Sequence, residues 1–450
     1  MNNRFPRAGK AWLVLPLLAA LCAPVDIRAT ATDSRNPLRF YQGDNGSYLQ
    51  ATFQAEFAVF TQGNSWFGNS EGVLGETSDF WWETLLRPGI EGSFTLTRSQ
   101  QVYGRVDATQ ANSGAGIDPD GTNLGMGAVN DLRIEKAYAG WRSGTLLSTL
   151  GDDFLDISFG RQQYIAGNGF LFYGQGGAGF NRAAWYIGGR RSAQYAGIVR
   201  MKTGNWSGDL LYLEADDIRK TSTRAGGATM DYAFDTLAKI GGGIYATESD
   251  LPQRDDMHIF DLRGSINPFA RSAALPTLQP LKFEAEYVGE DKADDLAAGH
   301  GWYIATSYQW DQIPWQPVLT YRYASFNADY SPLFYGFTDW GSWFQGEIIG
   351  EYVLANHNLD ADMIKLKIQP LDPVTMHLIY YRFTLHDAAA AGLASDDYAD
   401  EVDLIIDWKV NRHLSLSMVG AYAEPGEAAV QQTGGDQDWS YLMLYGCIKF

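Results

Sequence analysis

The chain ends with Tyr441-Leu442-Met443-Leu444-Tyr445-Gly446-Cys447-Ile448-Lys449-Phe450, and this stretch decides the fold. Every second residue from Leu442 to Phe450 lies on one face, and all of these except Gly446 are apolar. The opposite face carries tyrosine, methionine, cysteine and lysine. Alternation with a period of two over about ten residues is typical of a tilted strand that crosses a bilayer. The alternative is an edge strand of a soluble β-sandwich.

A strand that ends on a C-terminal phenylalanine after earlier aromatic residues resembles the closing strand of bacterial outer-membrane β-barrels. The start of the chain agrees with export. Residues 1–29 are predicted to be a secretory signal peptide, because Arg4, Arg7 and Lys10 precede an apolar segment, 11–23, that is too short to span a membrane. We therefore expect a chain that loses its signal peptide and resides in the outer membrane of a Gram-negative cell.

Charge and cysteine content narrow the class further. Removal of residues 1–29 takes four basic and one acidic side chain from totals of 34 and 53, which leaves a net charge of −22. Such acidity argues against nucleic acid or an anionic membrane surface as a partner. Only Cys447 then remains, so no intrachain disulfide can form. An exported chain without disulfides needs another source of stability, and the hydrogen-bonded wall of a closed barrel supplies it.

Strand-like segments recur from Tyr48 to Phe450, and short turns alternate with long loops between them. The clearest segment is 401–410, in which every even position is apolar and four of the five odd positions are charged. The pattern predicts an all-β fold, a transmembrane antiparallel up-and-down β-barrel over 48–450, after a polar lead-in at 30–47. Loop lengths give sixteen strands. Strands at 183–189 and 238–247 would give eighteen, with 216–237 as an unusually long periplasmic turn.

Basic residues recur within the predicted strands. By alternation, Arg87 shares a face with Glu91, Arg105 shares a face with Asp107, and Arg322 lies opposite Leu319, Tyr321 and Tyr323. These three arginines are therefore expected to point into the lumen, where guanidinium groups offer an anion a series of exchangeable partners. The alternative is that each arginine pairs with a luminal carboxylate and only braces the wall.

Catalytic patterns are weak in this sequence. No two of the six histidines have the spacing of metal ligands on a helix, and no Gly-x-Ser-x-Gly motif occurs. We therefore expect no enzyme, no metal site and no cofactor.

Four short motifs, in order along the chain, resemble the bacterial alginate-export outer-membrane porin family: 83–89 (ETLLRPG), 159–162 (FGRQ), 345–348 (QGEI) and 420–426 (GAYAEPG). The resemblance implies an eighteen-stranded monomeric barrel whose arginine-lined constriction passes an anionic polysaccharide outward. By this resemblance, Arg87 and Arg161 correspond to basic residues of the family's constriction, and Arg382 matches a basic position more loosely. The expected conduit, from pattern and resemblance together, consists of Arg87, Arg105, Arg161, Arg322, Arg382, Lys365 and Lys367.

Two features depart from the family, and a third concerns the direction in which Arg161 points. The turn before the penultimate strand is only about 410–413 long, where the family's alginate exporter has a long turn that plugs its pore. A basic residue expected on the following strand is absent from 415–417. Alternation places Arg161 with Ile157 and Phe159, so a luminal position for it requires a bulge or a site beyond the lipid band.

The expected partners are outer-membrane lipid and an anionic polysaccharide. The sequence does not decide whether the chain also binds periplasmic partners in an export complex. The alternative function is a general or differently selective porin for small solutes.

Overall fold

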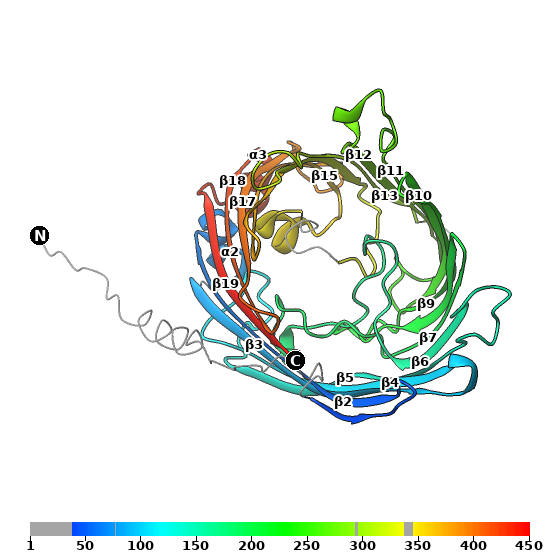
Figure 1. Ribbon diagram of the computed structural model, residues 1–450. Coiled ribbons are helices and arrows are strands. Elements are labelled where there is room, and N and C mark those ends of the chain that lie inside the picture. Colours follow the sequence, from blue (N-terminus) through cyan, green and yellow to red (C-terminus); the bar gives the residue numbers. More distant parts are fainter. Residues whose placement is uncertain (1–37, 77, 293–295, 337–344) are drawn as a thin grey trace, which may run out of the picture. The chain divides into compact units, whose positions relative to one another are not determined.

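The computed structural model describes residues 38–76, 78–292, 296–336 and 345–450. The signal peptide expected at 1–29 lies outside the described residues. From β2 to β19, each strand pairs antiparallel with the next, and β19 pairs with β2, so eighteen strands form a closed ring (Figure 1). The prediction of a transmembrane antiparallel barrel is confirmed, with the larger of the two strand counts. The strands are β2 Tyr48–Gly63, β3 Phe80–Thr95, β4 Gln101–Gly114, β5 Val129–Arg142, β6 Leu155–Arg161, β7 Tyr195–Thr203, β8 Trp206–Glu214, β9 Arg224–Phe234, β10 Ala238–Glu248, β11 Met257–Ile266, β12 Lys282–Asp291, β13 Gly299–Gln309, β14 Val318–Phe326, β15 Leu359–Leu371, β16 Val374–Leu385, β17 Asp397–Lys409, β18 Leu414–Pro425 and β19 Trp439–Lys449.

One short strand and several short helices accompany this ring of eighteen strands. The strand β1, Arg39–Gln42, pairs with the start of β2. A π-helix, η6, spans Gly346–Leu354. Within the described ranges, no helix is long and apolar enough to cross a membrane. The remaining helices are α2 Ser70–Leu74, α3 Glu427–Thr433, and the 3-10 turns η2 Ser65–Gly68, η3 Thr97–Ser99, η4 Phe180–Arg182 and η5 Pro276–Leu278.

The closing strand has the two faces expected from its sequence. Leu442 and Leu444 are 39% and 37% exposed, whereas Met443 and Tyr441 are buried on the luminal side. Ten cross-strand pairs, from Ser440 opposite Gly63 to Lys449 opposite Gln54, join β19 to β2. Because β19 pairs with β2 along its length, the sheet keeps no open edge there.

The barrel has eighteen strands, but one of them is not the segment expected from the sequence. The segment 238–247 is indeed a strand, β10, but 183–189 belongs to the connection between β6 and β7. The missing strand is β9, which occupies the middle of the segment expected to be a long turn, 216–237. What remains of that segment is a connection of moderate length on one side of β9 and a tight turn at 235–237 on the other.

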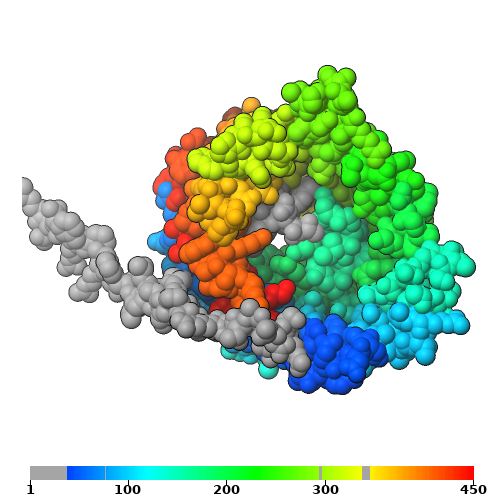
Figure 2. Space-filling model, in the orientation of Figure 1, coloured from blue at the N-terminus to red at the C-terminus, as the bar shows by residue number. Residues whose placement is uncertain are grey.

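The two longest connections, from β6 to β7 and from β14 to β15, lie at the same end of the barrel, and both fold into the lumen. One is the connection from β6 to β7, residues 162–194, and the other carries η6 (Figure 1). Figure 2 shows the lumen hollowed out between the wall and these segments. The packed interior of the molecule lies here. Phe172 and Tyr164 of the first segment and Ile348 and Ile349 of η6 are all fully buried.

Candidate functional site

The conduit is built by the barrel wall and by the two segments that fold into it. The 162–194 segment crosses toward the far wall, where the Phe172 ring lies 4.8 Å from Tyr245 and the Phe170 ring lies 5.6 Å from Phe326. Near β2 and β3 the same segment places Tyr186 against Phe60, with 5.1 Å between ring centroids. These apolar contacts fill part of the lumen and leave the rest to water.

Carboxylates of the wall hold both segments by their backbones. Glu83 on β3 accepts hydrogen bonds from the amides of Tyr186 and Ile187, at 3.2 and 2.9 Å. Glu135 on β5 accepts from the amides of Arg191 and Ser192, at 2.9 and 2.8 Å.

Glu401 on β17 does the same for the start of η6. It accepts hydrogen bonds from the amides of Ile348 and Ile349, both at 2.8 Å. Glu83, Glu135 and Glu401 are each no more than 1% exposed. A buried carboxylate needs such donors, because an unpartnered charge in the interior is strongly unfavourable.

Glu135 faces inward because β5 bulges at that point. Asp107 pairs with Lys136 while the next residue, Ala108, pairs with Ile134, so Glu135 is the extra residue. A β-bulge changes the alternation of side chains along one strand. Two successive residues, Glu135 and Lys136, are therefore directed away from the lipid-facing Ile134, which is 54% exposed.

Three cations gather where the 162–194 segment meets β3 and β5. Arg87 donates from Nε to Thr109 Oγ1, at 3.0 Å, and from its terminal nitrogen to the Gly189 carbonyl. Arg191 stacks on Tyr173, with its guanidinium 5.0 Å from the ring centroid, and donates to the Tyr173 hydroxyl. Among the described residues, no carboxylate forms an ion pair with Arg87, Lys136 or Arg191.

Arg105 and Arg161 also lie in the lumen, but both are paired. Arg105 contacts Asp107 at 2.7 Å and Glu91 at 3.1 Å. Arg161 pairs with Asp216 and donates to the Glu135 carbonyl at 3.1 Å. These two arginines brace the wall and its loops, which was the alternative interpretation of the sequence.

Gly160 turns Arg161 away from lipid. The neighbouring Phe159 is 67% exposed on the outer face, as alternation requires. Gly160 has φ +127°, and a Cβ on it would lie 2.4 Å from the Ala137 carbonyl oxygen. This backbone conformation is accessible to glycine and ends the strand at Arg161, whose side chain contacts Glu135 and Asp216 inside the barrel.

Arg322, Lys365 and Lys367 face inward on β14 and β15. Arg322 is only 4% exposed and donates to Gln345 Oε1 at 3.3 Å, so it supports the η6 segment from below. Lys365 and Lys367 alternate with Ile364 and Leu366, which are 48% and 37% exposed on the outer face. Lys367 is solvent-exposed within the lumen.

Arg382 departs from the expected position. On β16, Tyr381 and Phe383 are fully buried, whereas Leu378 and Tyr380 are 51% and 40% exposed. Arg382 shares the outer face with Tyr380, where it is exposed and pairs in register with Asp362 and Asp400. Alternation with the aromatic residues of its own strand places it outside the conduit.

Another part of the wall, on β9, β11 and β12, is acidic. Asp231, Asp261 and Glu286 line it, and Arg263 forms ion pairs with the two aspartates. The lumen therefore has a cationic side, around β3 to β5, and an acidic side, around β9 to β12.

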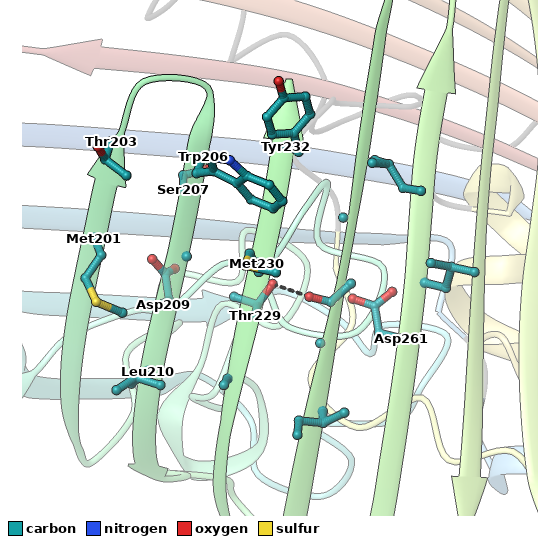
Figure 3. A pocket seen from close by; sticks show the side chains of 18 of the residues that line it. Met201, Thr203, Trp206, Ser207, Asp209, Leu210, Thr229, Met230, Tyr232 and Asp261 are labelled. Atoms are coloured by element: carbon teal, nitrogen blue, oxygen red, sulfur yellow. Dashed lines mark hydrogen bonds between the residues drawn. The ribbon is translucent and has the colours of Figure 1, made fainter. Parts of the chain in front are cut away.

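One hollow of the molecule lies outside the conduit. It has a volume of about 1040 Å³ and lies on the outer face of β7 to β11, over the small residues Gly208, Ala228 and Gly242 (Figure 3). Exposed apolar side chains such as Met230 and Leu210 flank it. Thr229 has turned away and donates to the Gly242 carbonyl. A hollow on this apolar face meets lipid chains, not a water-borne solute.

Within the described residues, no group of three or more metal-binding side chains is placed to hold a metal ion. Sequence reasoning missed Lys136, Arg191 and the amide-binding role of Glu83, Glu135 and Glu401. Glu83 and Glu347 nevertheless lie within two of the motifs singled out from the sequence.

Comparisons with known proteins agree with this architecture. The family model described as "Alginate export" matches residues 245–441, which confirms the expected resemblance over that part of the chain. The matched part contains the motifs at 345–348 and 420–426, whereas Arg87 and Arg161 lie outside it. No curated protein matches the sequence.

Solved outer-membrane proteins share the fold. Acinetobacter baumannii OccAB4 is 12% identical, with a TM-score of 0.56 over 92% of this chain and 100% of that one. OprD from Pseudomonas aeruginosa is 13% identical, with a TM-score of 0.53 over 89% and 94%. OccK11 (OpdR) from Pseudomonas aeruginosa is 10% identical, with a TM-score of 0.53 over 89% and 96%. Identities this low show the fold alone; together with the family match they support an outer-membrane channel.

Proposed function

We propose that this outer-membrane channel passes anionic saccharides, including acidic polysaccharide, along the cationic side of its lumen. The observation that carries the proposal is the group formed by Arg87, Lys136 and Arg191, which lies where the 162–194 segment narrows the lumen and has no carboxylate ion pair among the described residues. A carboxylated sugar polymer could exchange its contacts from one cation to the next without meeting one deep trap. The match to the alginate-export family supports the same class of substrate.

The net negative charge of the chain does not oppose this proposal. Charges on exposed loops are screened beyond about 8 Å at physiological ionic strength, so the charges nearest the permeating group dominate its energy. The acidic side of the lumen lies on a different part of the wall, and Arg263 partly neutralises it.

Planar-bilayer recordings test the proposal. In a gradient of potassium chloride, the reversal potential is expected to show a preference for anions, and an oligouronate of defined length is expected to interrupt the current more often than a neutral oligosaccharide of equal length. Cation preference together with equal interruption by both sugars would reject it.

The second candidate is a general porin for small solutes, favoured by the partly exposed Asp231 of the acidic wall, which a cationic or neutral solute could use. In that case the oligouronate would have no advantage over the neutral sugar. We further propose that residues 1–29 are removed as a signal peptide and that the barrel works as a monomer. N-terminal sequencing and the mass of the detergent-solubilised protein test these two points.

A further inference from the structure

The two luminal segments are joined to each other as well as to the wall. Tyr186 belongs to the 162–194 segment, and its hydroxyl donates to Glu347 of η6 at 2.6 Å. Its own amide donates to Glu83 of β3. The amide of Glu347 donates to Asp403 of β17 at 3.3 Å, beside the two amides held by Glu401. A continuous line of hydrogen bonds therefore runs from β3, through both segments, to β17.

The space behind this line is filled. Phe60 and Trp81 stack with 4.5 Å between their rings, Tyr186 packs edge-on against Phe60, and Tyr441 lies 6.0 Å from Tyr352 of η6. Of the space bounded by the described residues, the part open to solute therefore lies on the other side of the line. The position of the line decides how wide that passage is.

The backbone at the start of η6 fits its carboxylate closely. Gly346 has φ +92°, and a Cβ on it would lie 2.6 Å from a carboxylate oxygen of Glu401. Only a residue without a side chain allows the helix start to approach the wall this far. The contact is thus built for a short, fixed distance between η6 and β17.

We propose that Glu83, Glu135 and Glu401 are positioning residues that set the width of the conduit, and that the Tyr186–Glu347 hydrogen bond makes the two segments act as one unit. The proposal rests on the channel function proposed above and deepens it by naming what determines its size limit. Loss of one wall carboxylate frees two amides that were buried against it, so the segment gains by moving out of the barrel, where water can bind these amides.

The experiment compares Glu83→Ala, Glu401→Ala and Tyr186→Phe with the control Glu56→Ala. Glu56 on β2 is also a buried luminal carboxylate, but its partners are the wall side chains Gln54 and Tyr445. Single-channel conductance is measured in about 1 M potassium chloride, where the Debye length is about 3 Å and conductance reports mainly on width. Glu83→Ala and Glu401→Ala are expected to raise the conductance about twofold and to admit larger neutral sugars, since the segment no longer occupies the passage. Glu56→Ala is expected to leave both unchanged.

Tyr186→Phe removes the link between the segments without changing the wall or any charge. It is expected to give a smaller rise in conductance with brief transitions between two levels. Heat-modifiable migration on gels shows whether each variant has folded. Folded Glu83→Ala and Glu401→Ala proteins with wild-type conductance and size limit would overturn the proposal. If either alanine variant fails to fold, an unaltered conductance of Tyr186→Phe overturns it instead. The anion preference is measured separately through reversal potentials, so failure of the proposed function would not be mistaken for failure of this inference.

Discussion

Replacement of Arg87 by serine should weaken the anion preference of the channel. The guanidinium lies at the contact between β3 and the 162–194 segment and forms no ion pair with a carboxylate of the described residues. Serine therefore removes one full positive charge and leaves no carboxylate newly unpaired. Lys136→Ser, two strands away on β5, is expected to act in the same direction.

The size of the effect follows from Coulomb's law. An anion that passes within about 4 Å of a cation gains about 1 kcal/mol in a water-like medium and about 4 kcal/mol where the effective dielectric constant is near 20. The lower figure applies to a hydrated lumen. It corresponds to about a fivefold fall in the ratio of anion to cation permeability for each cation removed. High salt should shrink the difference, because the interaction is screened.

The assay is the reversal potential in a salt gradient, and Arg382→Ser is the matched control. Arg382 is also a strand arginine, but it lies on the outer face beside Tyr380. It should change the potential little. An equal shift for Arg382→Ser and Arg87→Ser, or no shift for folded Arg87→Ser, would refute the reasoning from which side chains face the lumen.

Three other outcomes are expected. Leu444→Arg puts a charge on the lipid face of the closing strand, which costs about 2–4 kcal/mol near mid-bilayer, so the amount of assembled protein in the outer membrane should fall; Met443→Leu, on the luminal face, serves as the control. Gly346→Ala should raise the conductance as Glu401→Ala does, because its Cβ would collide with that carboxylate; wild-type conductance would count against the tight fit. Burial raises the pKa of Glu347, in the luminal segment outside the strands, to about 7, and Tyr186, Glu401, Asp403 and Asp407 face it. Protonated Glu347 stabilises the position of η6 against the wall, and this contribution is fully present below the ordinary pKa of a glutamate. It is lost as the pH rises through about 7. The conductance should therefore increase from pH 5 to 8, and Glu347→Gln should flatten this pH profile.

The fold could be predicted because alternate residues of a barrel strand face lipid and lumen, so apolar and polar residues alternate along its sequence. The closing strand and the segment at 401–410 both show this pattern, and both became strands with the expected faces. The strand β9 escaped notice because Gly226, Gly227 and Ala228 give it no large apolar side chains over its first half. The 183–189 stretch was misleading for the opposite reason. Its Ala183, Tyr186 and Ile187 are buried, but against the inside of the barrel and not in its wall.

The site could be predicted only where it depends on alternation. Arg87 and Arg105 face the lumen as expected, and the same rule applied to Tyr381 and Phe383 would have placed Arg382 outside. Arg191 and the amides that bind Glu83 and Glu135 could not be found in this way. Their positions depend on how a long connection folds back on residues about a hundred and about sixty positions away in the chain. Such contacts produce no periodic pattern in the sequence.

The same carboxylates connect the width of the conduit with its charge. Glu83 and Glu135 accept backbone amides of the 162–194 segment, so their oxygens are directed at the segment and Arg87 and Arg191 keep neutral partners. The acidic residues of this region thus hold the structure in place while the cations face the passage. It follows that Glu83→Ala should alter conductance and ion preference together, because the released segment carries both Arg191 and the Gly189 carbonyl that holds Arg87. Tyr186→Phe changes no charge, so it should alter the conductance while the reversal potential stays at its wild-type value.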